Sequence, residues 1–239
     1  MNRPHPLINK MQRTDGGSLP TSVVQQVGAA LLRWGFVLLP SDTCYSLGAL
    51  PIDESVRNKV NVILSRKDEP ISLAFGSYLQ VQRFVQMDNT TAMLLERFTP
   101  GPITVVSKAK PDISKEVLTR TIGVTDGTIG VRIPDSRIER DIAASTQYPL
   151  MTIAVRDLDT GEAIQEFDRA LEIVSQGIDK VGGAGWAAIE GDEFYASHST
   201  VVRVSGVGKV ELLREGDISF ADIQEAIKTL SGWAVEDLS

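Results

Sequence analysis

The chain has 239 residues, of which 24 are basic, 31 are acidic and 42% are hydrophobic, and its formal net charge is −7. This composition is typical of a soluble globular protein and argues against broad nucleic-acid binding, although it is compatible with a local basic pocket for one phosphorylated ligand. The single cysteine and two histidines exclude a disulfide framework and a His/Cys metal cage, and they fit a cytoplasmic location. Neither a membrane-spanning apolar run nor a secretory signal is expected.

The first elements are predicted from apolar periodicity between capping and breaking residues. Residues 1–20 lack this pattern and are expected to form a flexible N-terminal tail. Thr21 or Ser22 and Asp53 are good helix N-caps, while Gly35 and Pro40 end the elements that precede them. The sequence predicts helices over 21–34, 53–64, 77–87 and 89–98 and strands over 36–39, 72–75, 103–107 and 129–133.

The second part of the chain alternates in the same way. It predicts helices over 136–146, 162–176 and 220–230, strands over 150–155, 186–189, 200–204 and 210–213, and a turn at 182–185. Strand 103–107 precedes strand 129–133, and 200–204 precedes 210–213, with no predicted helix between them. The expected fold class is therefore α/β, with a mixed parallel and antiparallel sheet and flanking helices. One domain is expected over residues 21–218, followed by a helical extension over residues 219–239.

Several segments place hydroxyl groups or arginines at the ends of apolar runs, where an open α/β sheet binds its ligand. Thr43 can hydrogen-bond a carboxylate or phosphate, but this segment alone is more typical of a simple turn capped by Asp42. Arg132 lies in an apolar strand and must pair with an acidic side chain or with an external anion. These segments are 40–48, 100–104, 128–134, and 199–202 with 213–216.

Other cations and reactive residues have structural as well as functional interpretations. Arg66 and Lys67 end a predicted helix, where they can stabilise its C-terminus or clamp phosphate oxygens. Arg214 can hold a phosphate or pair with a neighbouring carboxylate. The glycine-rich turn at 182–185 is not followed by Lys-Ser/Thr, which excludes a Walker motif. Cys44 and His198 lack an evident acid–base partner, so no catalytic nucleophile and no metal ligand is predicted.

Together, in order and spacing, the motifs resemble the YrdC-like family, which includes threonylcarbamoyl-AMP synthases and the YciO branch. The resemblance covers about residues 22–218. The family's Pro-Thr-(Asp/Glu)-Thr-x-Tyr-Gly-Leu-Gly segment is matched from Pro40 to Gly48, with Ser41 and Ser46 as substitutions. Its Pro-Gly-Pro-x-Thr, Val-Arg-(Ile/Val)-Pro, Ser-Thr-Val-(Val/Ile) and Arg-Pro-Gly segments are matched at 100–104, 131–134, 199–202 and 214–216, where Glu215 replaces the last proline.

The resemblance implies a twisted sheet around a basic central cavity. Synthases of the family join L-threonine, bicarbonate and ATP into threonylcarbamoyl-AMP and pyrophosphate, the precursor for the t6A37 modification of tRNA. This chemistry depends on positioning and charge neutralisation rather than on a nucleophilic side chain. Carried over by motif, the expected threonine-binding residues are Thr43, Arg132 and Ser199. The expected nucleotide-binding residues, with Mg2+ bridging the phosphates, are Arg66, Lys67, Thr128 and Arg214.

The sequence departs from the family at two motifs. The first lysine of the family's Lys-x-Arg clamp falls on Ser65, and its Ser-Ala-Asn motif falls on Ala154, Val155 and Arg156. The YciO branch departs at both motifs as well. These departures leave two alternatives open: a divergent paralogue that binds tRNA or double-stranded RNA, and a related transferase that uses Arg156 for another acceptor.

Overall fold

The structure is a computed structural model that describes residues 7–9, 18–33, 35–182, 185–191 and 194–236. Its strands are β1 (Leu7–Asn9), β2 (Phe36–Pro40), β3 (Tyr45–Ala49), β4 (Leu73–Ala74), β5 (Ile103–Lys108), β6 (Thr128–Arg132), β7 (Leu150–Ala154), β8 (Trp186–Ile189), β9 (Thr200–Gly206) and β10 (Lys209–Arg214). Its helices are α1 (Thr21–Leu32), α2 (Glu54–Ile63), α3 (Tyr78–Val81), α4 (Asn89–Phe98), α5 (Lys115–Ile122), α6 (Arg137–Ser145), α7 (Phe167–Lys180) and α8 (Phe220–Glu236).

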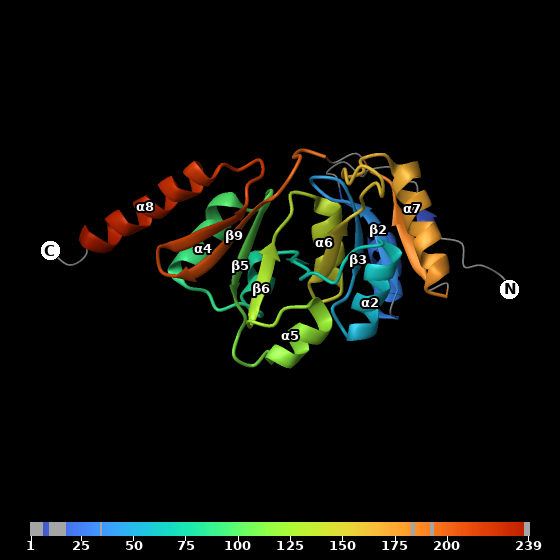
Figure 1. Ribbon diagram of the computed structural model, residues 1–239, viewed down its shortest axis with the longest axis horizontal. Coiled ribbons are helices and arrows are strands. Elements are labelled where there is room, and N and C mark those ends of the chain that lie inside the picture. Colours follow the sequence, from blue (N-terminus) through green and yellow to red (C-terminus); the bar gives the residue numbers. More distant parts are fainter. Residues whose placement is uncertain (1–6, 10–17, 34, 183–184, 192–193, 237–239) are drawn as a thin grey trace.

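All of these strands join one ten-stranded sheet in the order β1-β8-β2-β3-β7-β4-β6-β5-β9-β10. The pairs β1–β8, β2–β8, β4–β6 and β5–β9 are parallel, and the other neighbouring pairs are antiparallel. The predicted α/β fold class with a mixed sheet is therefore confirmed. Figure 1 shows α2 and α7 near one end of the elongated molecule and α4 and α8 near the other.

The hydrophobic core lies on both faces of this sheet, as strand β2 illustrates. Val37 and Leu39 pack on one face in a cluster with residues of α1 and α6. Phe36 and Leu38 pack on the other face in a cluster that includes residues of α2 and α7. Because helices cover both faces, β2 is buried along its whole length and is a continuous apolar run rather than an alternating one.

The register of the sheet brings distant motifs together. Ala74 pairs with Arg132 between β4 and β6, and Ile103 pairs with Thr200 between β5 and β9. The backbone N–H of Thr200 also donates to the carbonyl of Pro102 at 2.8 Å. The ends of β4, β6 and β9 therefore meet in one region, although their sequences are widely separated.

Two predicted connections are wrong. Helix α5 lies between β5 and β6, where no helix is predicted; Ser114 caps it by accepting from Val117 N, and Gly123 ends it with φ +74°. The β5–β6 pair is nevertheless antiparallel, as expected. Strand β3 is also absent from the prediction. A short turn after Pro40, in which Ser41 N donates to Cys44 O at 3.0 Å, returns the chain antiparallel to β2.

Other differences concern element boundaries. Leu7–Asn9 pairs with β8 inside the predicted flexible tail, whose remaining parts at 1–6 and 10–17 lie outside the described residues. Helix α3 ends at Val81 rather than near residue 87. Helix α7 starts at Phe167 rather than at 162, because residues 156–163 form a bridged turn. Residues 183–184 of the predicted glycine-rich turn also lie outside the described part.

The C-terminal helix does not stand apart from the domain. Helix α8 packs on α4, and its Ile223 and Ala226 are buried, with Ile223 part of the main hydrophobic cluster. The division at residues 20 and 218 stays a prediction. No helix in the described part of the chain combines the length and apolarity needed to cross a membrane.

Candidate active site

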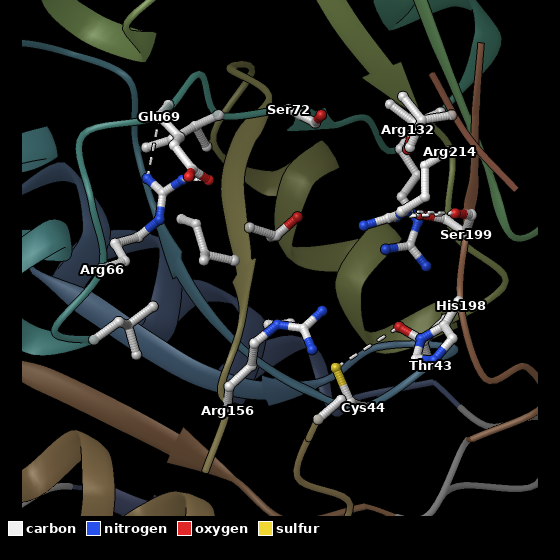
Figure 2. Close-up of a pocket in the computed structure, with 18 of the residues that line it drawn as sticks. Thr43, Cys44, Arg66, Glu69, Ser72, Arg132, Arg156, His198, Ser199 and Arg214 are labelled. Carbon is white, nitrogen blue, oxygen red and sulfur yellow. Dashed lines mark hydrogen bonds and ion pairs between the residues drawn. The ribbon is translucent and has the colours of Figure 1, made fainter. Parts of the chain in front are cut away.

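A cavity of about 420 Å³ opens where strand ends and loops from the whole chain converge. It is lined by the loop between β2 and β3, the segment after α2, the ends of β6 and β7, the loop before β9 and the end of β10 (Figure 2). The predicted site residues among its lining residues are Thr43, Arg66, Arg132, Ser199 and Arg214. Further polar or charged lining residues are Cys44, Glu69, Ser72, Thr104, Thr152, Arg156, Ser197 and His198.

Arg132 already has a carboxylate partner inside the protein. Its Nη2 forms an ion pair with Oδ1 of Asp42, whose side chain is 1% exposed. The other Asp42 oxygen accepts from the backbone N–H of Asp135 at 2.9 Å. The question left open by the sequence is therefore answered: the fixed counter-charge of Arg132 is Asp42. Arg132 Nε remains buried without a hydrogen-bond partner among the described residues.

A second buried carboxylate lies behind this ion pair. The Ser41 hydroxyl lies 2.5 Å from Glu139 Oε2 and 3.1 Å from Asp42 Oδ1, so it links the two carboxyl groups. Burial lowers the pKa of Arg132, the negative charge of Glu139 opposes this shift, and the positive charge of Arg214 adds to it. Arg132 is thus held in position by a network of buried acidic groups.

The loop that carries Thr43 is fixed by its backbone. The Asp42 carbonyl accepts from the N–H groups of Tyr195 and Ala196 at 2.8 and 3.0 Å, and the Thr43 carbonyl accepts from Gln165 Nε2 at 3.0 Å. The adjacent Cys44 thiol lines the cavity, and burial is the main cause that raises its pKa, so the thiol is protonated at neutral pH.

The motifs around Ser199 and Arg214 form a single unit. Arg214 donates to the Ser199 carbonyl from Nε at 3.2 Å and from Nη2 at 2.9 Å, and to Ser199 Oγ from Nη2 at 2.7 Å. The N–H of Gly216 donates to Thr200 Oγ1 at 2.9 Å. A Cβ atom on Gly216 would lie 2.5 Å from the carbonyl carbon of Ser199 and 2.7 Å from the nitrogen of Thr200. Glycine is therefore required for this close approach of two backbone segments.

The opposite side of the cavity is held less tightly. Arg66 Nη1 donates to Asn61 Oδ1 at 2.9 Å, and its Nη2 lies 3.9 Å from Glu69 Oε2. Arg156 Nη1 donates to the Gly161 carbonyl at 2.8 Å. Figure 2 shows the guanidinium of Arg156 between Arg66 on one side and Arg214 on the other.

Lys67 and Thr128 are the predicted site residues that are absent from the cavity lining. Ser65 has φ +49°, and after this turn Lys67 is exposed while Arg66 lines the cavity. Thr128 lies four residues before Arg132, or about 13 Å along an extended strand, and its hydroxyl donates to Asp126 Oδ1 at 2.7 Å. The nucleotide-binding roles of Lys67 and Thr128 stay predictions, and both residues lie outside the lining of this cavity.

Sequence reasoning left the place of Arg156 open, and it assigned no role to Ser72 or Thr104. Arg156 had a usable signal, because it is a cation directly after the apolar run 150–155. Ser72 had no such signal in the sequence, since it lines the cavity only because the short strand β4 that follows it pairs with β6. No group of three or more His, Cys, Asp or Glu side chains among the described residues is arranged to hold a metal ion.

Comparisons with relatives extend over most of the chain. It is 25% identical over 199 residues to a putative threonylcarbamoyl-AMP synthase of Methanocaldococcus jannaschii, and the match covers 82% of this chain and 86% of that protein. It is 26% identical over 199 residues to the threonylcarbamoyl-AMP synthase of Rattus norvegicus, covering 82% of this chain and 68% of the relative.

Solved structures share the fold. Sua5 of Pyrococcus abyssi complexed with L-threonine superposes with a TM-score of 0.73 at 20% identity, over 93% of this chain and 61% of Sua5. YciO of Escherichia coli gives a TM-score of 0.67 at 16% identity, over 92% of this chain and 98% of YciO. Residues 29–216 match the Sua5/YciO/YrdC family, described as "Telomere recombination". With the motifs, the cavity and this match in agreement, the chain belongs to the Sua5/YciO/YrdC family.

Proposed function

We propose that this protein is an L-threonylcarbamoyladenylate synthase-like nucleotidyltransferase, which joins L-threonine, bicarbonate and ATP. The observation that carries the proposal is the convergence of Thr43, Arg132, Ser199 and Arg214 on one cavity. Their motifs are spread over 172 positions of the sequence, from residue 43 to residue 214. Relatives that match 82% of the chain are named threonylcarbamoyl-AMP synthase, which supports the same activity.

The proposed reaction divides into two steps. The threonine amine attacks the carbon of bicarbonate to give a carbamate, with loss of water. A carbamate oxygen then attacks the α-phosphorus of ATP and forms a P–O bond, while the bond to the bridging oxygen breaks and its electron pair leaves with pyrophosphate. Neither step requires a nucleophile from the protein; both require that the reactants are held in line and that negative charge is neutralised.

The cavity supplies these functions through fixed donors. Arg132, locked by Asp42, is suited to bind the threonine carboxylate, and the Thr43 and Ser199 hydroxyls lie in the same cavity to orient the amino acid. Arg214 is suited to bind phosphate oxygens. Mg2+ belongs to the substrate here, because it enters with the ATP phosphates and the described residues offer no cluster of ligands for it.

The test measures pyrophosphate release from ATP in the presence of L-threonine and bicarbonate, with detection of threonylcarbamoyl-AMP by mass spectrometry. We expect release that depends on threonine and that falls at least about 10-fold in Arg132→Lys, because lysine lacks the second fork of the guanidinium. Release equal to a blank without threonine would exclude the proposal. Salt-sensitive binding of tRNA or double-stranded RNA without such release would favour the RNA-binding alternative. RNA partners and the cytoplasmic location stay predictions.

A further inference from the structure

The amino-acid part of the cavity must provide a proton acceptor if the first step of the proposed reaction takes place there. At neutral pH the amino group of free threonine is an ammonium ion, which has no lone pair to attack carbon. A group near the bound amino acid must therefore take one of its protons. The guanidinium and hydroxyl groups named so far for threonine are not proton acceptors of this kind near neutral pH.

Three of the described side chains that line the cavity belong to types that can accept a proton: Cys44, Glu69 and His198. Burial is the main cause that raises the pKa of the Cys44 thiol, so it already holds its proton at neutral pH. Glu69 lies on the opposite side of the cavity, 3.9 Å from Arg66. His198 remains, and imidazole is the side chain best suited to take up and release protons near neutral pH.

His198 lies between the two hydroxyl groups that are expected to orient threonine. On one side, the Asp42 carbonyl accepts from the N–H of Ala196 at 3.0 Å, which holds the loop before His198 against the loop that carries Thr43. On the other side, His198 directly precedes Ser199 in the chain. Figure 2 shows the imidazole at the cavity, near Thr43. The ring is therefore placed in the amino-acid part of the site.

The backbone of His198 is fixed, whereas its ring is available to a ligand. The N–H of His198 donates to Asp217 Oδ1 at 3.2 Å, and its carbonyl accepts from the N–H of Asp217 at 3.0 Å. Among the described residues, the imidazole nitrogens have no hydrogen-bond partner. The side chain is also exposed, so a proton taken from a ligand can pass on to water.

We propose that His198 is the general base that removes a proton from the ammonium group of threonine. The inference rests on the proposed function. The imidazole takes one ammonium proton, and the neutral amine then attacks the carbon of bicarbonate. A second N–H proton leaves with a bicarbonate hydroxyl as water, so that a carbamate with one N–H remains. The imidazolium releases its proton to solvent, which regenerates the base.

The other charged groups around this part of the cavity do not obscure a titration of His198. They come from the loop after β2, from the ends of β6, β7 and β10, and from the segment after β10: Cys44, Arg132, Arg156, Arg214 and Asp217. Guanidinium and carboxylate groups ordinarily keep their charge between about pH 6 and 8, and the thiol is protonated. A change in this range therefore reports on the imidazole or on the ligand.

The pH dependence of threonine-dependent pyrophosphate release in His198→Gln and His198→Ala tests the role of the base. We expect kcat at neutral pH to fall about 100-fold, while the KM for threonine changes by less than about 3-fold because Arg132 still binds the carboxylate. The rate of both variants should rise about 10-fold per pH unit toward alkaline pH, since solvent then removes the proton, whereas the rate of the parent protein levels off. Added imidazole should restore part of the rate of His198→Ala.

The matched control is Tyr195→Ala, in the same loop. The Tyr195 side chain is exposed and lies outside the cavity lining, and the variant keeps the backbone N–H that donates to the Asp42 carbonyl at 2.8 Å. Its rate and pH profile should match those of the parent protein, with no effect of added imidazole. Equal losses in Tyr195→Ala and His198→Ala, both with the parental pH profile, would overturn the inference, because the loop alone would explain them.

Calorimetric titration with L-threonine in the absence of ATP separates this inference from the proposed function. Affinity should fall as the pH is lowered from about 8 to 5, where imidazole side chains take up a proton and would repel the ammonium group. This fall should be absent in His198→Gln. If it is present but pyrophosphate release is not, His198 stands beside the amine and the synthase function fails. If release occurs and His198→Gln keeps the parental pH profile, the function stands and the base fails. The same pH dependence of threonine affinity in both proteins would also overturn the inference.

Discussion

The two sides of the cavity are built in different ways. On the β9–β10 side, formed by residues 197–200 and 214–217, side chains and backbone fix one another: Arg214 holds Ser199, and the Asp217 carboxylate accepts from the N–H groups of Ser197 and His198 at 2.6 and 3.2 Å. On the opposite side, formed by Arg66 and Arg156, the guanidinium groups donate, among the described residues, to local partners within five positions of the chain.

Because of this difference, we expect the fixed side to set the orientation of a ligand and the opposite side to supply positive charge. The fixed side can hold a small ligand in one orientation without further loss of conformational entropy on binding. The opposite side supplies cations on long side chains that can adapt to a charged ligand. The motifs of the fixed side match the family apart from Glu215, whereas the departures at Ser65 and at 154–156 lie on the adaptable side.

The largest effect is expected from Asp42→Asn, on the fixed side. This variant removes the charge that neutralises Arg132, and breaking a buried ion pair by removing one partner typically costs about 3–5 kcal/mol. Asp42 is 1% exposed, so water cannot replace it. We expect the free energy of unfolding in urea to fall by an amount in this range.

The double variant Asp42→Asn with Arg132→Met is the control for this prediction. It removes both charges, so it should be less destabilised than the sum of the single variants. A loss below about 1 kcal/mol in Asp42→Asn would mean that Arg132 is balanced by solvent or by Glu139 alone, and the fixed side would then be less rigid than its contacts indicate.

A smaller loss is expected from Gly216→Ala. Its methyl group would lie against backbone atoms of Ser199 and Thr200, and backbone cannot move aside as the end of a side chain can. Such overpacking costs about 1–3 kcal/mol. Since the strain would displace Ser199 and Arg214, L-threonine affinity measured by calorimetry should fall together with the melting temperature.

Gly206→Ala in the same hairpin provides the matched control. No atom lies within 4 Å of a Cβ at this position, and Gly206 has no positive φ. Stability and threonine affinity should both stay close to those of the parent protein. If the two variants behaved alike, the close approach at Gly216 would have no functional consequence.

The contrast between the two sides also explains what the sequence could predict. The fold class followed from apolar runs alternating with capped helices, and the β9–β10 pairing followed from the short connection between these strands, whereas the β5–β6 connection contains helix α5. Arg132, Ser199 and Arg214 were identifiable because each is a polar residue at the end of an apolar run. The contacts of these residues could not be predicted from the sequence. The Asp42–Arg132 pair, for example, joins residues that are 90 positions apart.

The differences between the prediction and the structure have separate causes. Ser65 has a left-handed conformation for which a serine carries no signal, and after it Arg66 lines the cavity while Lys67 is exposed. Strand β3 was missed because the motif from Tyr45 to Gly48 resembles a loop sequence until it pairs with β2 and β7. Helix α5 was missed although Ser114 and Gly123 are recognisable caps.

The smallest effect is expected from Glu69→Gln, on the adaptable side. The Glu69 carboxylate is 67% exposed and lies 3.9 Å from Arg66, and exposed ion pairs contribute no more than about 1 kcal/mol. The urea midpoint should therefore change little. Pyrophosphate affinity should rise slightly at low salt and converge with that of the parent protein as salt screens the interaction. A loss of stability comparable to that of Asp42→Asn would contradict the comparison, because Arg66 would then belong to a rigid framework as Arg132 does.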